Sequence, residues 1–372
     1  MKLKIILIFL LCMVLTGCFN YTGIDRLTMV AGFSIDNKKD TFILNFEIID
    51  TIKSNPTEGI KTKVIECEGR TITETITNCK KLLSSRLYFG NTQIVIINKD
   101  IAKKGIHDIV LLLLNEHEFR ESLKVVVSDE KKAKDIIMAD KTNNAILSYQ
   151  INDIIYEDQS ITLSTALIPV YKIFSQVISK DKAFVLPNFK LKKNNDDKKV
   201  ASSNGLDLFK GNKLVGHINE QNSKAYLFVT DQVRGGDITI KLKEDKKVSL
   251  QVLKSSTRNE FELKNDKLKV KQKINMNILL RDYSMSDREK DEEEFEKVKK
   301  EIVKKMEKEI TKYVYELLNT YKIDVFNFKE NIYKTDQKLY KKIKNKKIDF
   351  FSDIEYDLKI NCLFEDRGFL GG

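Results

Sequence analysis

The sequence predicts a multi-domain α+β protein, and three observations support this prediction. Hydrophobic residues make up 42% and charged residues 32% of the 372-residue chain, the balance of a folded globular protein. The first half alternates between strand-like and helix-like segments, whereas the second half is mostly strands and one long helix. We therefore expect an N-terminal mixed α/β part, followed by an antiparallel sheet with a long packed helix in the C-terminal domain. Two or three domains are expected, because single cores stop growing near this length.

The amino terminus predicts secretion and lipid attachment. Lys2 and Lys4 precede an apolar run from Ile5 to Leu15, which is too short for a helix that spans a bilayer with roughly 20 residues. Leu15-Thr16-Gly17-Cys18 resembles the bacterial lipobox. We predict a lipoprotein signal peptide over 1–17, a diacylated Cys18 and a lipid-anchored tether over 18–24. An ordinary signal peptide followed by a chance cysteine is the alternative.

Residues 25–192 are expected to form an α/β region of one or two subdomains. Apolar alternation or continuous apolar runs indicate strands, and apolar residues three and four apart indicate helices. Pro169 should kink a helix or begin one. The expected strands are Asp25–Asp36, Thr41–Asp50, Lys61–Glu68, Ile94–Ile97 and Leu123–Ser128. One helix is expected to begin near Gly69, and three more are expected over Asp100–Asn115, Glu130–Met138 and Ser160–Ser179.

A polar segment from Asn194 to Lys199 predicts either a tight turn or an interdomain loop. Beyond it, residues 200–372 predict a C-terminal α+β domain. Ser286-Asp287-Arg288-Glu289 forms a capping box, which opens a helix predicted over 287–322. The expected strands are Gly205–Phe209, Lys213–His217, Ala225–Thr230, Asp237–Leu242, Val248–Lys254, Arg258–Leu263, Lys267–Leu280 and a last one from Ile354 to Phe364.

Three cysteines remain once Cys12 leaves with the leader and Cys18 is acylated. None of Cys67, Cys79 and Cys362 has metal-ligand spacing. Buried free thiols are expected for Cys79 and Cys362, which fall on apolar faces. A disulfide between Cys67 and Cys79 is the alternative.

The chain lacks the motifs of common enzymes and cofactor sites. His117-Glu118-Phe119-Arg120-Glu121 lacks the second histidine of a zinc protease, and we expect a surface cluster at a helix end. No serine has nucleophile-elbow glycines, and no glycine run fits a phosphate loop. We therefore predict no catalytic residue, no metal and no cofactor.

A formal net charge of +11 suits an anionic lipid surface. Nucleic acid is not expected as a partner, because no basic segment has interleaved aromatic residues. Lys341–Lys347 is expected to be a solvated turn, with a patch that faces lipid or a partner as the alternative.

The order of several segments resembles the Ger(x)C (GerAC-like) family, the C subunit lipoproteins of spore germinant receptors. Where the family often has Trp, this chain has Tyr21, Phe228 and Tyr340, and Asn327 stands where a Gly is usual. The segments that carry the resemblance are Ile24–Asp36, Arg86–Asn91, Ile94–Ile97, Ile101–Ile106, Gly205–Lys210, Lys213–Gly216, Arg234–Gly236, Asp324–Phe328 and Gly368.

The resemblance implies a non-enzymatic lipoprotein on the outer face of the spore inner membrane. It also implies a complex with membrane-embedded A and B subunits that together sense nutrients and start germination. A solute-binding lipoprotein that serves a transporter is the alternative. That alternative predicts two Rossmann-like lobes, which the antiparallel second half does not favour.

Overall fold

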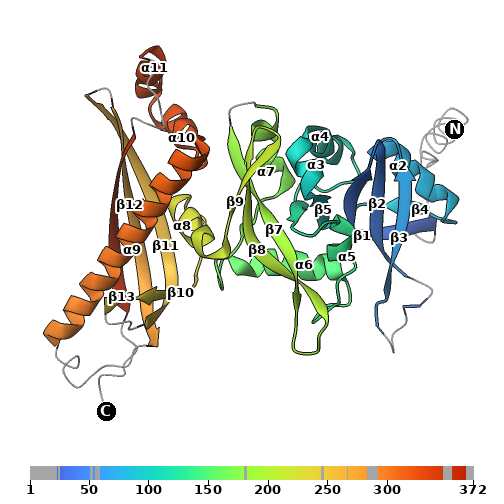
Figure 1. Ribbon diagram of the computed structural model, residues 1–372, viewed down its shortest axis with the longest axis horizontal. Helices are drawn as coiled ribbons and strands as arrows, with labels where there is room; N and C mark the ends of the chain where they lie inside the picture. Colours follow the sequence, from blue (N-terminus) through green and yellow to red (C-terminus); the bar gives the residue numbers. More distant parts are fainter. Residues whose placement is uncertain are drawn as a thin grey trace, which may run out of the picture.

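The computed structural model describes residues 23, 26–50, 53–54, 59–179, 182–243, 247–265, 267–282, 292–346 and 354–365. Two sheets follow one another along an elongated molecule (Figure 1). The α+β class, with the large mixed part first and the sheet with the long helix second, is confirmed.

The first sheet has nine strands in the order β3-β2-β1-β5-β6-β7-β8-β9, with β4 paired to β1. Strands β1, β5, β6 and β7 run parallel, and antiparallel strands extend the sheet on both sides. The bounds are β1 (Leu27–Lys38), β2 (Thr41–Ile49), β3 (Thr62–Gly69), β4 (Arg86–Tyr88), β5 (Ile94–Asn98), β6 (Lys124–Ser128), β7 (Ala183–Lys193), β8 (Lys199–Lys210) and β9 (Lys213–Ile218).

Helices cover both faces of this sheet, which explains the continuous apolar runs of β5 and β6. Val95 and Ile97 face one core, together with apolar residues of α3, α4 and α7. Ile94 and Ile96 face the opposite core with residues of α5 and α6. The helices are α2 (Ile72–Asn78), α3 (Lys99–Lys104), α4 (His107–Asn115), α5 (Ala133–Ile137), α6 (Leu147–Asp158) and α7 (Val170–Val177).

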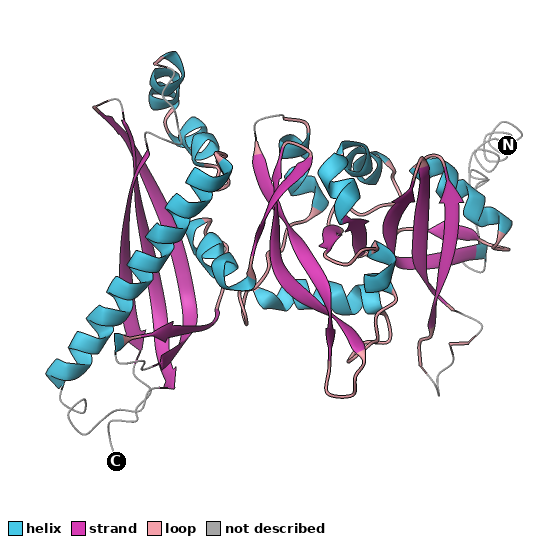
Figure 2. Cartoon of the chain, viewed as in Figure 1, coloured by secondary structure: helices cyan, strands magenta, loops and turns pink. Residues whose placement is uncertain are grey.

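The second sheet has four strands, β10 (Gly236–Lys241), β11 (Lys247–Lys264), β12 (Lys267–Asp282) and β13 (Ile354–Glu365), in that order. The long helix α9 (Glu292–Tyr321) crosses one face (Figures 1 and 2). Helix α8 (Glu220–Val229) lies between the sheets, and α10 (Phe328–Thr335) and α11 (Gln337–Asn345) follow α9. One apolar cluster joins β7 and β8 through α8 to the second sheet.

The polar segment at 194–198 is a tight turn between β7 and β8 within the first sheet. The sheet therefore continues across the predicted interval between 25–192 and 200–372. The predicted strand Ala225–Thr230 is wrong, because these residues lie in α8, whose first turn Asn219 caps. A short apolar run fits the buried face of a helix as well as a strand.

The second sheet is not wholly antiparallel, because β13 pairs in parallel with β12. The strands predicted at Val248–Lys254 and Arg258–Leu263 form one strand, β11. The helix predicted over Asp100–Asn115 is divided at Gly105, whose φ of 137° no helix contains. Pro169 was expected either to kink the helix predicted over Ser160–Ser179 or to begin one, and it stands at the start of α7. The first part of that prediction, Ser160–Ile168, is therefore not helical. Helices α6, α10 and α11 were not predicted, and α11 contains Lys341, Lys342 and Lys344 of the segment expected to be a turn.

Cys79 is not a free thiol, because it forms a disulfide with Cys67, with the two Cα atoms 5.5 Å apart. Cys362 is free and partly buried. The capping box at Ser286–Glu289 lies outside the described residues.

Candidate functional site

Cys18, the predicted lipid-attachment residue, lies outside the described residues. The described strands begin with β1, whose first residues pair with β4 at one end of the long axis (Figure 1). None of the helices in the described part of the chain combines the length and the apolar character needed to cross a membrane.

Asp36, at the end of β1, connects the first strand to α5. Its carboxylate is 6% exposed and accepts hydrogen bonds from the backbone N–H groups of Ala133 at 2.8 Å and Lys134 at 2.9 Å. It also accepts from Asn98 Nδ2 at 3.1 Å. The N-cap residue of α5, Lys132, provides no capping side chain. Asp36 therefore serves as a distant cap, and its charge suits the positive end of the helix.

Glu47 on β2 does the same for α6. The side chain is 1% exposed and accepts from the backbone N–H groups of Leu147 at 2.9 Å and Ser148 at 2.8 Å. The Ser148 hydroxyl donates a third bond at 2.7 Å. A Cβ atom on Gly32 of β1 would lie 2.6 Å from the Ser148 Cβ, so only glycine allows this approach. The start of α6 is thus fixed directly against β1 and β2.

Asp324 caps α10 in the second half of the chain. Its carboxylate accepts from the N–H groups of Phe328 at 2.9 Å and Lys329 at 2.7 Å. Burial raises its pKa to about 6, and these two backbone hydrogen bonds oppose the increase only in part. Asn327, where the resemblance leads one to expect Gly, has a φ of 57°, the left-handed conformation that Gly and Asn adopt most readily.

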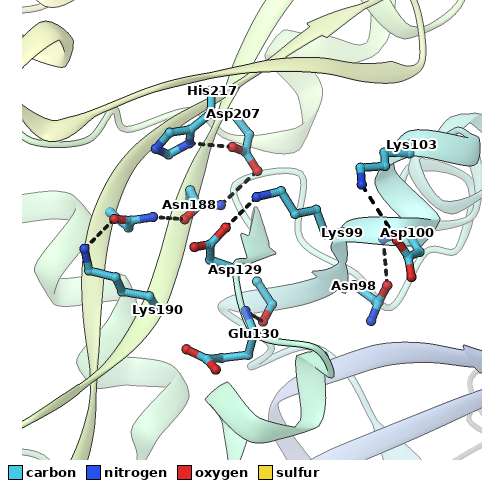
Figure 3. Close-up of polar contacts among 12 residues, drawn as sticks. Asn98, Lys99, Asp100, Lys103, Asp129, Glu130, Asn188, Lys190, Asp207 and His217 are labelled. Carbon is cyan, nitrogen blue, oxygen red and sulfur yellow. Dashed lines mark hydrogen bonds and ion pairs between the residues drawn. The ribbon is translucent and has the colours of Figure 1, made fainter.

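A further polar network ties β7, β8 and β9 together (Figure 3). Asp207 on β8 is fully buried and hydrogen-bonds to His217 Nδ1 on β9 at 2.8 Å. Asn188 Nδ2 on β7 donates to the other Asp207 oxygen at 2.9 Å. Asn204 donates to Asn188 Oδ1 at 2.9 Å, and Lys190 donates to Asn204 Oδ1 at 2.6 Å.

Lys99, at the start of α3, lies beside this network and pairs with Asp129 after β6 (Figure 3). Burial opposes the charge of Lys99, but the hydrogen bond to Asp129 and the negative charges of Asp207 and Asp129 together raise its pKa. The Lys99–Asp129 pair, which follows β5 and β6, therefore lies within electrostatic reach of Asp207 on β8.

An Asp–His pair is also part of catalytic triads, where the histidine must contact a nucleophile. Within the described residues, the hydrogen bond of the His217 ring goes to Asp207, and no hydroxyl or thiol completes the set. The described residues also contain no group of three or more His, Cys, Asp or Glu side chains placed to hold a metal. The geometry supports a structural tie between strands.

The predicted surface cluster at His117–Glu121 follows the end of α4, where Glu118 forms an ion pair with Arg86 of β4. This pair borders a cavity of about 420 Å³, whose lining combines apolar side chains such as Ile76, Leu87 and Phe119 with polar and charged ones such as Thr73 and Lys80.

Sequence reasoning missed the buried carboxylates Asp36 and Glu47. The alternation of Phe42, Leu44, Phe46 and Ile48 placed Glu47 on a solvent face. That face is covered by α6, which periodicity did not reveal. An acidic residue inside an otherwise apolar strand was the available signal.

Comparison with known proteins matches two family models in sequence order. The model described as "Spore germination protein N-terminal domain" matches residues 20–191. The model described as "Spore germination B3/GerAC like, C-terminal" matches residues 204–368. The crystal structure of the GerBC protein shares the fold, with a TM-score of 0.59 and 15% identity over 90% of this chain and 97% of that one.

Two curated relatives come from Bacillus subtilis (strain 168). The spore germination protein KC is 24% identical over 365 residues, which covers 91% of this chain and 89% of that protein. The putative spore germination protein YfkR is 26% identical over 71% of each chain. Because the two family models together match most of the sequence, the chain belongs to the Ger(x)C, or GerAC-like, family of spore germination proteins.

Proposed function

We propose that this chain is the lipid-anchored C subunit of a spore germinant receptor, and that it acts without catalysis by assembling with the membrane A and B subunits. The two family models, matched in order along the chain, carry the proposal. The lipobox-like Leu15–Cys18 adds the attachment to the outer face of the spore inner membrane. Nutrient-triggered germination then depends on the subunit through assembly.

The architecture supports this proposal over a solute-binding lipoprotein of a transporter. A solute-binding protein would have two similar parallel lobes with ligand contacts at strand ends. Here a nine-stranded mixed sheet is followed by a four-stranded sheet with one long helix across it. The polar groups that follow β5 and β6, Lys99 and Asp129, bond to one another, which leaves them engaged within the protein.

The test replaces the anchor residue in spores. Cys18→Ala removes the acyl attachment, and the folded body should be unaffected because the tether precedes β1. A tethered subunit meets its partners at a high effective concentration, so its loss should release the chain from the membrane and slow nutrient-triggered germination sharply. Membrane fractionation and germination rates with a nutrient measure both effects.

Cys12→Ala in the leader is the matched control, because it removes a cysteine and leaves Leu15–Cys18 intact. Germination by an agent that bypasses the receptor should stay normal in both strains. A normal nutrient response without lipid-modified protein would contradict the role of the anchor.

A further inference from the structure

One end of the molecule has an unusual concentration of positive charge. On α11, Lys338, Lys341, Lys342 and Lys344 are all exposed, and none forms an ion pair with a described residue. The apolar face of this helix, formed by Leu339 and Ile343, is buried against the body. The lysines therefore lie on the exposed side of a helix whose opposite side is packed against the protein.

The acidic residues of the same segment already have partners within the protein. Glu330 pairs with Lys334 at 2.7 Å and with Lys182 at 3.3 Å, and Asp336 caps α11 through Leu339 N at 2.9 Å. These carboxylates are therefore committed to other groups. The helix dipole favours cations near its carboxyl end, which accounts for Lys342 and Lys344. It does not account for Lys338 and Lys341 on the preceding turns.

Two tyrosines lie next to these lysines. Tyr333 of α10 is 53% exposed, and its ring centroid lies 5.2 Å from that of Tyr340 on α11. Exposed tyrosine beside lysine is typical of surfaces at the membrane interface, where the ring lies at the level of the headgroups. We call Lys338, Lys341, Lys342 and Lys344, together with Tyr333 and Tyr340, the basic tip.

We propose that the basic tip binds the headgroups of an anionic lipid bilayer. Every cation in α10 and α11 is a lysine. Lysine acts as a point charge on a flexible stem, which suits a diffuse anionic surface, whereas recognition of carboxylates in an acidic protein favours the planar fork of arginine. Each basic residue close to such a surface adds attraction that salt weakens.

The tip also determines how the protein lies on the membrane. Helix α11 projects from the part of the molecule that holds the second sheet, at the upper left of Figure 1, and the first described residues of β1, paired with β4, are at the opposite, right-hand end. The turn between β11 and β12, flanked by exposed Lys264 and Lys267, lies at the same end as α11. If Cys18 is acylated as proposed above, attachments at both ends hold the long axis along the bilayer.

The experiment uses the mature chain from residue 18 with Cys18→Ser, so that no acyl chain contributes. Co-sedimentation with vesicles of phosphatidylglycerol and phosphatidylcholine is compared with vesicles of phosphatidylcholine alone. We expect binding only to the anionic vesicles and release in about 0.5 M NaCl. The variant K338Q/K341Q/K342Q/K344Q should bind at least roughly tenfold more weakly.

The β7–β8 turn offers a matched control. Lys192, Lys193, Lys198 and Lys199 are exposed there, and K192Q/K193Q/K198Q/K199Q makes the same change in net charge. This control should bind within about twofold of the parent, since its lysines lie away from α11 (Figure 1). Lys342→Glu alone should weaken binding in the same direction, and circular dichroism verifies that each variant is folded.

Equal losses in the two quadruple variants would mean that net charge alone drives binding and would overturn the proposal. Equal binding to both vesicle types, or no binding to the anionic vesicles, would also overturn it. Because the protein in this assay has no acyl chain, these outcomes bear on the tip alone. The Cys18→Ala strain tests the anchor separately.

Discussion

The two sheets are stabilised in different ways. In the first sheet, β5 and β6 are buried at every position, and helices cover both faces. In the second sheet, β10 and the first half of β13 alternate between buried and exposed residues, because α9 covers a single face. Polar groups differ accordingly, since the first sheet holds buried carboxylates that cap distant helices, and the second has exposed ion pairs such as Lys269–Glu355.

This difference shows where each region can change without loss of folding. A sheet enclosed on both faces must satisfy polar groups internally, so Asp36 and Glu47 each link segments about a hundred residues apart. The second sheet instead packs its covered face against the apolar stripe of α9, with further apolar residues from α8, α10 and α11 in the same cluster. The free face and the ends of the second region are then available for contacts with other molecules.

Replacing Glu47 should produce the largest effect. Glu47→Ala leaves the backbone N–H groups of Leu147 and Ser148 buried without acceptors, and each such group costs about 1–3 kcal/mol. We expect a loss of about 4–5 kcal/mol in the free energy of unfolding, measured by urea denaturation.

Glu66→Ala on β3 is the matched control for that change. Glu66 pairs with Lys134 at 2.8 Å, but both side chains are about 40% exposed, so its removal should cost less than about 1 kcal/mol. Similar losses for the two variants would show that the buried caps are not what distinguishes the first region.

The apolar stripe of α9 should give the next largest effect. Ile302 is fully buried in the cluster that joins α9 to the second sheet. Ile302→Ala should cost about 3 kcal/mol, within the range for deleting buried aliphatic side chains. Lys305→Ala is the control, because Lys305 lies about one turn further along α9 and forms an exposed ion pair with Glu309. This change should cost less than about 0.5 kcal/mol. If the Ile302 variant matched it, α9 would not be a structural strut.

These two regions also explain what the sequence could and could not predict. The α9 stripe of Val298, Ile302, Ile310 and Leu317 follows helical spacing, and the structure buries all of it. Local periodicity is enough there because one helix meets one sheet. Glu47 was missed because its burial depends on α6, which packs from a hundred residues away.

Local patterns also failed where two structures share the same spacing. Tyr226–Val229 suits a buried strand or a buried helix face, and the cap at Asn219 selects the helix. Parallel pairing of β13 with β12 has no local signature, because alternation is the same in either direction. The disulfide required a distance that no sequence pattern provides.

The smallest effect should come from the buried carboxylate of Asp324, because burial raises its pKa to about 6 from an ordinary value of 3.8. The folded state then holds the proton more tightly than the unfolded state. Between about pH 4 and pH 6 the folded state binds more protons, so this group's contribution to stability falls as the pH rises and is constant above about pH 6.

Asp324→Asn removes this titration while an amide oxygen can still accept one of the two hydrogen bonds. The free energy of unfolding of the variant, relative to the parent, should therefore rise by about 2–3 kcal/mol between pH 4 and pH 7. Urea denaturation of both proteins at several pH values measures the change. Asp336→Asn is the control, because Asp336 also caps a helix but is exposed. If the difference in the free energy of unfolding between the parent and Asp324→Asn were constant across this pH range, burial would not oppose the ionisation of the Asp324 carboxyl, and the prediction would be wrong.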